Sequence, residues 1–501
     1  MKPTVSRFDK EESRLRLIDA HWPLHGRVMR ACLAELPDNP HWAPERSCLH
    51  VWAPVVTAYV TWVLRKAQKR GTKRLYFLSR DGYPLYRAAQ TLLGEESPLE
   101  LRYLRVSRYS LRLPELALKS DTCPDWLFLC GIDVTMRKIL RRGGLTETEL
   151  NEAAWILGFD RSLDDILTRP EIRCWELRAQ AAWPRLAPLF QKHGEQALLS
   201  ARGYLCQEGL SDEISSALVD SGWMGSTQAS INRLIPDRQK PLEGYYFGLY
   251  DLPAGADPSR YHTFYFRPGT DILRKADFCN CLFEAVLSEP AGMTMGYRSV
   301  YTDPHGIIGN GCGSSQDKAN DSTAPAVRYL PLLSDTIHYN DRKINRLLPQ
   351  ILTYASRYGE ALRKEDMDGT NPEIDTGDRL CRHVLTRFML HPTAGEAAWY
   401  GTLRFCDDML EDASMQEVAA RLSYREIRNL EFTARLLDRL GLRHRIPHES
   451  GWIYGSIVRR GTDTKQSLEA ARRYRRLMYL RKYRPSTKNR KVADGKKQVM
   501  R

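Results

Sequence analysis

Two short apolar runs that each end in a polar turn constrain the fold of this chain most strongly. Residues 75–78 lead into Ser79-Arg80-Asp81-Gly82, and residues 217–219 lead into a turn that begins at Asp220. A helical pattern follows each turn. In an α/β sheet such turns lie at the carboxyl ends of strands, where helix N-termini direct free N–H groups into a common crevice. The sequence therefore predicts one ligand site built from both turns.

The pattern around these runs alternates between helix and strand, which favours a mostly parallel, Rossmann-like α/β sheet with helices on its faces. Helices are predicted at residues 52–70, 84–93 and 227–234, and strands at 75–78, 101–106, 215–219, 244–250 and 261–266. Residues 121–204 have a helical pattern and are expected to form an insertion between sheet strands. The predicted fold class is thus α/β with a helical insertion and a helical C-terminal region.

This pattern divides the chain into six parts. N-terminal helices and the first part of the α/β core occupy 1–120, the helical insertion 121–204, and the second part of the core 205–300. The stretch 301–327 is rich in Gly, Ser, Asp and Asn and is predicted to be a loop or boundary. Residues 328–470 show almost no strand-like alternation and are predicted to be helical, and 471–501 form a basic tail.

The first turn carries groups suited to an anionic ligand. Ser79 and the following N–H groups can cradle an oxyanion, Arg80 can pair with phosphate, and Asp81 can accept a proton or hold Mg²⁺ indirectly. Gly82 permits a tight backbone turn. The alternative is a plain helix start with Asp81 as a salt-bridged N-cap. Arg108, after the next predicted strand, is a further candidate for phosphate contact.

The second turn resembles the phosphoribosyl-pyrophosphate loop of phosphoribosyltransferases, because an apolar strand leads into Asp220, two spaced glycines and a Ser-Thr pair that opens a helix. In those enzymes the acidic residue meets the ribose hydroxyls and the Gly–Ser/Thr turn wraps the 5′-phosphate. The resemblance implies that Asp220 is catalytic and binds Mg²⁺, and that Asp81 is catalytic. It also implies phosphate-binding residues in the turn: Ser221, Gly222, Gly225, Ser226 and Thr227.

This turn departs from that family in two respects. One acidic residue precedes the glycines where two are typical, and bulky Trp223 stands inside the loop. The alternative is a tight strand–helix turn in which Asp220 is structural. Further along, Glu284 and Glu289 are within possible reach of the same crevice, with a helix C-terminal cap as the other interpretation.

Several segments together resemble bacterial proteins classed as haloacid-dehalogenase-superfamily hydrolases of surface-polysaccharide loci. They are KRLYFLSRDGY (73–83), SR (107–108), VDSGWMGSTQ (219–228), GYYFG (244–248), SEP (288–290) and HPTAGEA (391–397). Longer members carry a dehalogenase-like domain ahead of this region, and this chain is expected to lack it. The resemblance implies a role in polysaccharide biosynthesis.

The basic character of the chain is concentrated in its tail. Residues 472–501 hold 13 Lys or Arg and one acidic residue, so they account for +12 of the net charge of +14. The tail is expected to begin as a helix that either docks Leu477 and Leu480 on the body or binds an anionic surface, membrane or nucleic acid. A body with no charge excess argues against a dedicated nucleic-acid enzyme.

Further features favour a cytoplasmic protein, peripheral at the inner membrane if the tail adheres there. The charged N-terminus lacks the apolar region of a signal peptide, and eleven cysteines follow no disulfide or zinc spacing. The longest apolar stretch, 51–64, is shorter than the roughly 20 residues that span a bilayer, so no transmembrane segment is predicted.

These observations lead to two functional hypotheses. The first is an enzyme that binds a phosphorylated sugar or nucleotide with Mg²⁺ and performs phosphoribosyl, glycosyl or phosphoryl transfer, in that order of preference, or hydrolysis. The second is a non-catalytic scaffold of a glycan-assembly or defence complex with a degenerate ligand fold. The missing second acidic residue favours the scaffold.

Overall fold

The computed structural model describes most of the chain. The described residues are 7–94, 97–118, 121–131, 133–302, 308–309, 326–335, 339–366, 371–406, 408–410, 415–423, 426, 450–461 and 464–483. Much of the stretch 303–325 and of the tail beyond residue 483 lies outside them.

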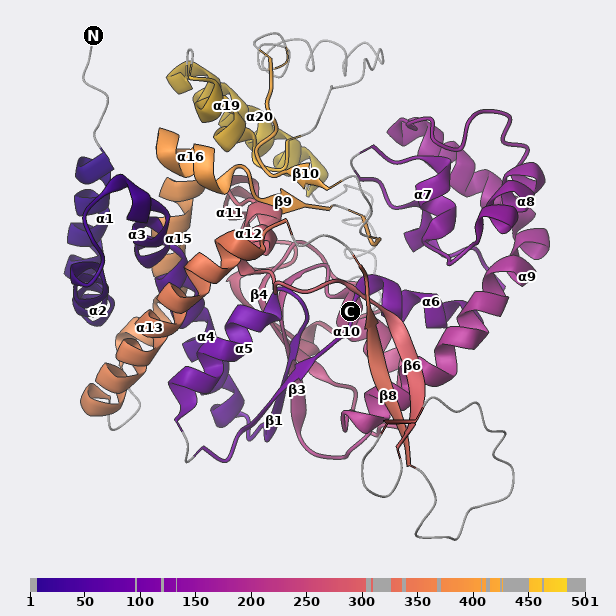
Figure 1. Cartoon of the computed structure of the whole chain (residues 1–501), viewed down its shortest axis with the longest axis horizontal. Coiled ribbons are helices and arrows are strands. Elements are labelled where there is room, and N and C mark those ends of the chain that lie inside the picture. The colour runs from indigo at the N-terminus through magenta and orange to yellow at the C-terminus, as the bar shows by residue number, and fades with distance from the viewer. Residues whose placement is uncertain are drawn as a thin grey trace, which may run out of the picture.

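A five-stranded sheet forms the centre of the molecule (Figure 1). Its strands are β1 (Arg74–Leu78), β2 (Glu100–Leu104), β3 (Ser216–Trp223), β4 (Glu243–Leu249) and β5 (Tyr261–Phe266). They run in the order β2-β1-β3-β4-β5, and all neighbouring pairs are parallel. Parallel strands buried on both faces have continuous apolar runs instead of an alternating pattern. The prediction of a mostly parallel, Rossmann-like α/β sheet is confirmed.

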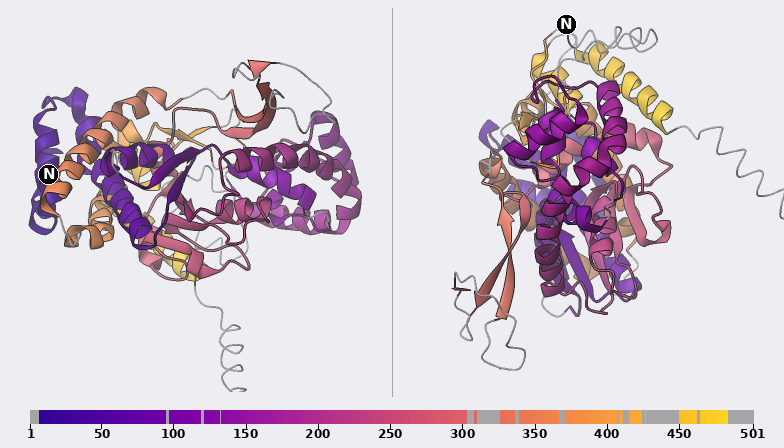
Figure 2. Two further views of the ribbon diagram at one scale, coloured as in Figure 1. Left: turned by 90° about the horizontal axis from the view of Figure 1, so that it is seen from below. Right: turned by 90° about the vertical axis from the view of Figure 1, so that its right-hand side faces the viewer.

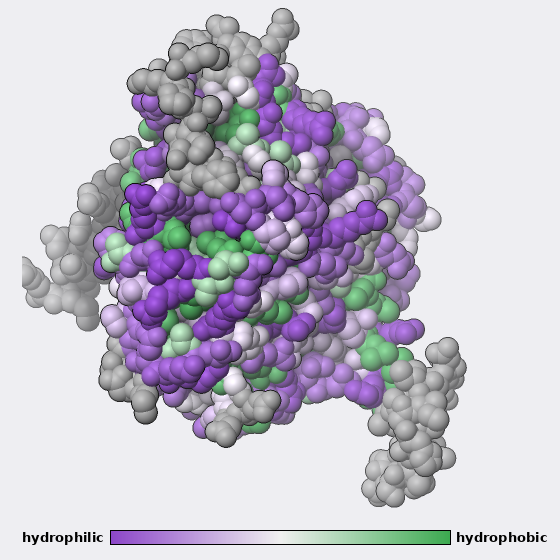
Figure 3. Space-filling view, turned by 60° about the vertical axis from the view of Figure 1, so that its left-hand side comes forward, coloured by the Kyte–Doolittle hydropathy of each residue, from purple (hydrophilic) through white to green (hydrophobic). Residues whose placement is uncertain are grey.

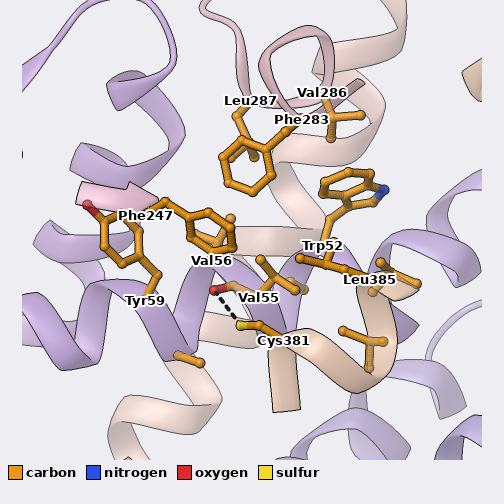
Figure 4. Packing of buried hydrophobic residues seen from close by; sticks show 14 of the residues in the cluster. Trp52, Val55, Val56, Tyr59, Phe247, Phe283, Val286, Leu287, Cys381 and Leu385 are labelled. Atoms are coloured by element: carbon orange, nitrogen blue, oxygen red, sulfur yellow. Dashed lines mark hydrogen bonds between the residues drawn. The ribbon is translucent and has the colours of Figure 1, made fainter. Parts of the chain in front are cut away.

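One face of the sheet packs against α4 (Trp52–Lys69), α5 (Gly82–Leu93), α13 (Asp341–Glu365) and α15 (Gly377–Leu390). Aromatic side chains fill this interface (Figure 4). The rings of Phe247 on β4 and Phe283 are 4.5 Å apart, and Trp52 meets Phe283 edge-on at 6.1 Å. The N- and C-terminal helices thus share one core with the sheet.

The opposite face is covered by α6 (Arg108–Leu118), α9 (Arg169–Gln207) and α10 (Ser226–Leu234). Strand residues Tyr76 and Leu218 point to this side and are fully buried. Their neighbours in sequence, Phe77 and Val219, belong to the core of the other face. This period of two explains why β1 and β3 have apolar residues at successive positions.

The helices of the predicted insertion gather around a core of their own at one end of the molecule (Figure 2). They are η2 (Asp125–Phe128), α7 (Met136–Arg141), α8 (Glu147–Leu157) and the first part of the 39-residue α9. Trp183 and Phe190 of α9 stack at 5.3 Å inside this core. Thr146 and Thr168 form capping boxes that begin α8 and α9, as their Thr-x-x-Glu sequences dictate.

The N-terminal helices are fastened to the C-terminal region by a buried ion pair. Arg14 donates to Glu396 at 2.7 Å, and Ser47 donates to the same carboxylate at 3.2 Å. Both charged side chains are almost fully buried. The elements that meet here are α1 (Arg7–His21), α2 (Pro23–Ala34), η1 (Pro40–Trp42), α3 (Ala43–His50), α14 (Pro372–Asp375) and α16 (Ala394–Tyr400).

One helical stretch, Pro40–Lys69, is long and apolar enough to cross a membrane by length and composition. However, 89% of its most apolar window is buried inside the protein. Residues of α4 such as Val55, Tyr59 and Val60 are inaccessible to solvent. This burial is that of a core helix.

Three predictions about the strands were wrong. The predicted strand 215–219 continues as β3 to Trp223, because Asp220, Gly222 and Trp223 still pair with β4. Strands also occur in the predicted loop and helical regions. β6 (Thr294–Thr302) pairs antiparallel with β8 (Ala326–Leu333) and β7 (Ile308–Gly309), and β9 (Arg404–Phe405) pairs with β10 (Gln416–Glu417). Short polar or aromatic strands lack the long apolar run that marks a core strand.

The remaining elements are η3 (Pro258–Arg260), α11 (Ile272–Asp277), α12 (Asn280–Leu287), α19 (Ile453–Arg460) and α20 (Thr464–Lys482). Of these, α12 carries Phe283 into the main core. Helix α20 contacts α11 and α19 and buries Leu468 and Ala471. The alternative in which Leu477 and Leu480 dock on the body is wrong, since both are exposed.

We expect Tyr59→Phe to lower the free energy of unfolding by about 1–3 kcal/mol, the cost of leaving buried acceptors without a donor. The Tyr59 hydroxyl donates to the backbone carbonyls of Asp220 at 2.8 Å and Tyr245 at 2.9 Å, which joins α4 to β3 and β4. Denaturant unfolding measures the change. Tyr454→Phe is the control, since its buried hydroxyl has no partner among the described residues and its loss should be nearly neutral.

Candidate functional site

The sheet order places a crevice at the carboxyl ends of β1 and β3. The chain leaves β1 into α5 on one face and leaves β3 into α10 on the other. Neighbouring strands whose helices lie on opposite faces define a topological switch point, and ligands of open α/β sheets bind there. Both polar turns singled out in the sequence lie at this point.

A direct hydrogen bond joins the two turns. The Ser221 hydroxyl donates to Asp81 at 2.6 Å, across 140 residues of sequence. Asp81 occupies the N-cap position of α5, but its side chain makes no capping hydrogen bond. The interpretation of Asp81 as a helix cap is therefore wrong. Its carboxylate is directed to β3, and it is only partly accessible to solvent.

Asp81 and Asp220 form an acidic pair. The pKa of Asp220 is raised to about 8, first because the group is withdrawn from water and second because the negative charge of Asp81 acts on it. Burial also raises the pKa of Asp81. The hydrogen bond from Ser221 and the positive charges of Arg80 and Arg108 lower this pKa, but by less than burial raises it. Two interacting carboxyl groups of this kind hold a proton between them near neutral pH. Asp81, from the turn after β1, is thus a second acidic residue beside Asp220 in the crevice.

The backbone after Asp220 requires glycine and is strained at the next residue. Gly222 has a φ of +114°, and a Cβ there would lie 2.3 Å from the carbonyl oxygen of Gly248. Trp223 adopts a φ of +78°, a conformation unusual for a bulky residue. Its indole N–H donates to Glu284, and its ring lies among Phe266, Phe278 and Phe283. Trp223 therefore anchors the loop in the core.

Gly225 takes the N-cap position of α10 with a φ of +62°, so no side chain caps this helix. The first-turn N–H groups of α10, next to the half-buried Ser226 and Thr227, are therefore available to an anion.

Ser79 has a structural role in place of the predicted oxyanion contact. Its hydroxyl donates to the carbonyl of Val106 at 2.6 Å and accepts from the Val106 N–H at 2.9 Å. Its own N–H donates to Leu104 at 3.0 Å. These bonds fix the end of β1 to the loop after β2, and they engage the hydroxyl and the N–H of Ser79. Gly82 is buried beneath the same turn.

Arg108 begins α6 and is exposed at the rim of the crevice. Its Nη2 lies 3.4 Å from the carbonyl of Asp408. Its charge acts on both Asp81 and Asp220. Arg80 supplies a second cation, and its carbonyl accepts from Tyr83 and Glu289. The crevice thus combines two carboxyl groups with two guanidinium groups.

A cavity of about 70 Å³ extends from Arg80 and Asp81 toward the C-terminal region. A few tens of Å³ hold one water molecule, so the enclosed part of the crevice fits a small group such as a phosphate, and the rest of a larger ligand would lie outside it. Sequence reasoning did not identify the residues on its far side, which come from β9 and the start of α13: Tyr339, Asn340, Asp341 and Arg404.

Both glutamates that the sequence left open line the same cavity. Glu284 accepts from Trp223, and Glu289 binds Arg105 at 2.7 Å and accepts from Tyr103 at 2.8 Å. Glu289 is therefore neutralised by Arg105, and neither contact is that of a helix cap.

Asp81 and Asp220 are suited to a divalent cation with few protein ligands. Among the described residues there is no cluster of three or more His, Cys, Asp or Glu of the kind that encloses a metal. Mg²⁺ characteristically takes one or two carboxylates and completes its shell with water and ligand phosphates. The two aspartates fit that pattern, since their mutual repulsion is relieved by a cation.

No protein-family model matches the chain, and no curated protein shows significant similarity to it. The assignment of function therefore rests on the geometry of the crevice.

Proposed function

We propose that the crevice binds a phosphorylated sugar or nucleotide together with Mg²⁺ and catalyses transfer or hydrolysis at that ligand. The observation that carries this proposal is the pair Asp81 and Asp220, which meet through Ser221 at the switch point of the sheet. A structural turn has no need of two carboxyl groups whose pKa values are both raised. Perturbed groups of this kind in a crevice are typical of functional sites.

Each group has a chemical role in this proposal. The two aspartates orient Mg²⁺ or sugar hydroxyls, and Asp220 is poised near neutral pH to take up or release a proton. Arg80 and Arg108 stabilise phosphate charge, and the free N–H groups at the start of α10 contact a second phosphate oxygen. The bound Mg²⁺ would polarise a phosphate oxygen or leaving group.

Phosphoribosyl transfer is the preferred reaction, followed by glycosyl and phosphoryl transfer. Two features support a phosphoribosyltransferase-like site: the order of strand, acidic residue, glycines and Ser-Thr helix start, and the second carboxylate that Asp81 provides. The competing scaffold hypothesis was favoured by the missing second acidic residue. The proximity of Asp81 to Asp220 weakens that argument. From the family resemblance we also propose a part in polysaccharide biosynthesis.

A thermal-shift screen tests the proposal on the full-length protein. Sugar phosphates, nucleotides and phosphoribosyl pyrophosphate are added with and without Mg²⁺, and Mg²⁺-dependent stabilisation by one class is expected. Turnover of the stabilising ligand then distinguishes an enzyme from a scaffold. If none of the three ligand classes stabilises the protein at millimolar concentration, the proposed ligand site is rejected.

We also propose that α20 attaches the protein to an anionic membrane surface. Asp277 binds Arg472 and Arg476, and Arg475 donates to the carbonyls of Ala276 and Phe278, so these arginines hold the helix on the body. Helix α20 lies at the surface of the molecule (Figure 2). Its other side is left with exposed apolar and basic residues: Arg473, Leu477, Met478, Leu480 and Arg481. Such a mixture favours a lipid interface over nucleic acid.

Leu477→Ser with Leu480→Ser is expected to weaken binding to phosphatidylglycerol vesicles by about tenfold or more, since each leucine contributes on the order of 1 kcal/mol on partial burial. Vesicle co-sedimentation measures this. Leu177→Ser with Leu199→Ser, two exposed leucines of α9, is the matched control and should bind normally. Equal binding by both double variants would exclude α20 as the contact. Removal of α20 by truncation is less informative, because it also exposes the surface of the body on which Leu468 and Ala471 pack.

A further inference from the structure

A second concave surface lies between the N-terminal helices and α15, and it shares no residue with the crevice. It is a groove of about 550 Å³, within the range of small-molecule sites. Figure 3 looks onto the side of the molecule that carries α1, α2 and α13, where hydrophobic residues occur in patches bounded by hydrophilic ones. The groove is lined by Leu17, His21, Trp22, Thr376, Arg379, Arg382, His383, Thr386 and Arg387.

The lining is strongly cationic. Arg379, Arg382 and Arg387 come from a single helix. Arg382 and His383 follow Arg379 by three and four residues, and Arg387 follows His383 by four. These spacings place them along one face of α15. None of the described residues that line the groove is acidic. Like charges at such spacings destabilise a helix, so the arrangement costs free energy in the absence of an anion.

Nearby carboxylates do not neutralise this face. Asp378 on α15 is bound by Arg274 at 3.0 Å, and Asp19 on α1 is bound by Arg30. Among the described residues, none forms an ion pair with Arg379, Arg382 or Arg387. Arg387 donates to the hydroxyl of Ser13 at 3.2 Å, which leaves its charge uncompensated.

One buried nitrogen atom among the residues that line the groove lacks a hydrogen-bond partner in the described part of the chain. Nε2 of His383 is inaccessible to solvent and has no hydrogen-bond partner among the described residues. Burial and the charges of Arg387, His21 and Arg14 lower the pKa of His383 to about 4, so its ring is neutral at physiological pH. The ring of Trp22 lies 6.5 Å away and closes the wall of the groove.

We propose that this groove binds a chain of phosphate groups, as in a nucleoside triphosphate or inorganic polyphosphate, independently of the crevice. Arg379 and Arg387 are eight residues apart, which corresponds to about 12 Å along the helix axis. That span matches several linked phosphates better than a single one, and guanidinium groups are the preferred partners of phosphate oxygens.

The test is isothermal titration of the full-length protein with inorganic tripolyphosphate at low salt, without Mg²⁺. Arg379→Gln with Arg382→Gln is expected to weaken binding about tenfold or more, because each charge-assisted contact contributes severalfold. Both arginines are exposed, so the variant should fold normally, and melting curves verify this. Arg382→Gln alone is a milder second variant with an expected loss of about threefold.

Two controls separate this site from others. Arg173→Gln with Arg178→Gln removes the same charge from exposed positions of α9 and should leave binding unchanged. Asp220→Asn alters the crevice and should also leave it unchanged, so that failure of the crevice proposal does not imply failure here. Equal binding by the groove variant and the α9 variant would overturn the proposal. Binding of a 20-nucleotide RNA with no binding of tripolyphosphate would overturn it as well.

Discussion

Asp220→Asn is expected to abolish Mg²⁺-dependent binding of the phosphorylated ligand while it stabilises the protein at alkaline pH. The amide retains the volume of the side chain but cannot supply the negative charge that a cation or sugar hydroxyl requires. Loss of binding by a factor of about 100 or more corresponds to removal of one of two charged ligands. Titration of the ligand identified in the thermal-shift screen, with Mg²⁺ present, measures the loss.

The gain in stability follows from the raised pKa. The folded-state pKa of Asp220 is about 8, well above its ordinary value of 3.8. The contribution of the protonated group to stability is therefore complete below about pH 4 and is lost as the pH rises through 8. Asparagine does not titrate and avoids this loss. We expect a gain of about 1–3 kcal/mol at pH 8.5, since the site is partly accessible to water, and almost none at pH 4.

Asp164→Asn is the matched control, because Asp164 is an exposed aspartate whose pKa is lowered by hydrogen bonds from Arg137. That variant should leave ligand binding intact and should not become more stable at high pH. If Asp220→Asn unfolds the protein instead, Asp220 is a structural residue and the crevice proposal fails.

Gly222→Ala is expected to destabilise the protein by roughly 4 kcal/mol or more, the sum of backbone strain and a steric clash. The clash is with backbone, the carbonyl of Gly248 on the adjacent strand, and it cannot be relieved by a side-chain rotation. A shift of β3 relative to β4 would also displace Ser221 from Asp81. Denaturant unfolding and Mg²⁺-dependent ligand binding should therefore both be impaired.

The control for this substitution is Gly395→Ala. Gly395 lies in α16 and is exposed, and no neighbouring atom lies within 4 Å of the position that an alanine methyl group would take. Alanine should be neutral or stabilise the helix by up to about 1 kcal/mol. Equal stability of both variants would show that β3 tolerates a side chain at position 222.

The sheet could be predicted because its strands are buried on both faces and its turns are polar. The uninterrupted runs at residues 75–78 and 217–219 are recognisable without any long-range information. The position where β3 ends was not predictable from such a run, since Asp220 and Gly222 are poor strand residues that pair because β4 lies beside them. Strands β6 and β8 were missed for a different reason. In β6 polar and apolar residues are mixed irregularly, and β8, though largely apolar, contains Pro331 and leaves Val327, Leu332 and Leu333 exposed.

The residue types of the site could be predicted from the sequence, but the contacts between these residues could not. That two turns converge at one sheet edge follows from parallel topology. Three contacts depend on side-chain geometry and join residues more than 20 positions apart in the sequence. They are the approach of Asp81 to the turn at Asp220, the hydrogen bond of Ser79 to Val106 and that of Trp223 to Glu284. The arginines of α15 were not recognised, because the groove exists only where α1 and α2 approach that helix.

The ion pair between Arg14 and Glu396 has a consequence for how the protein is made. Its partners are separated by 382 residues, so a ribosome that adds about 5–20 residues per second needs roughly 20 to 75 seconds to produce the second after the first. During that interval the guanidinium cannot enter the core without an unpaired charge. The N-terminal helices are therefore expected to reach their final packing only after residue 396 has been made. In chains that end before residue 396, Arg14 has no partner, and we expect these helices to be more accessible to proteases.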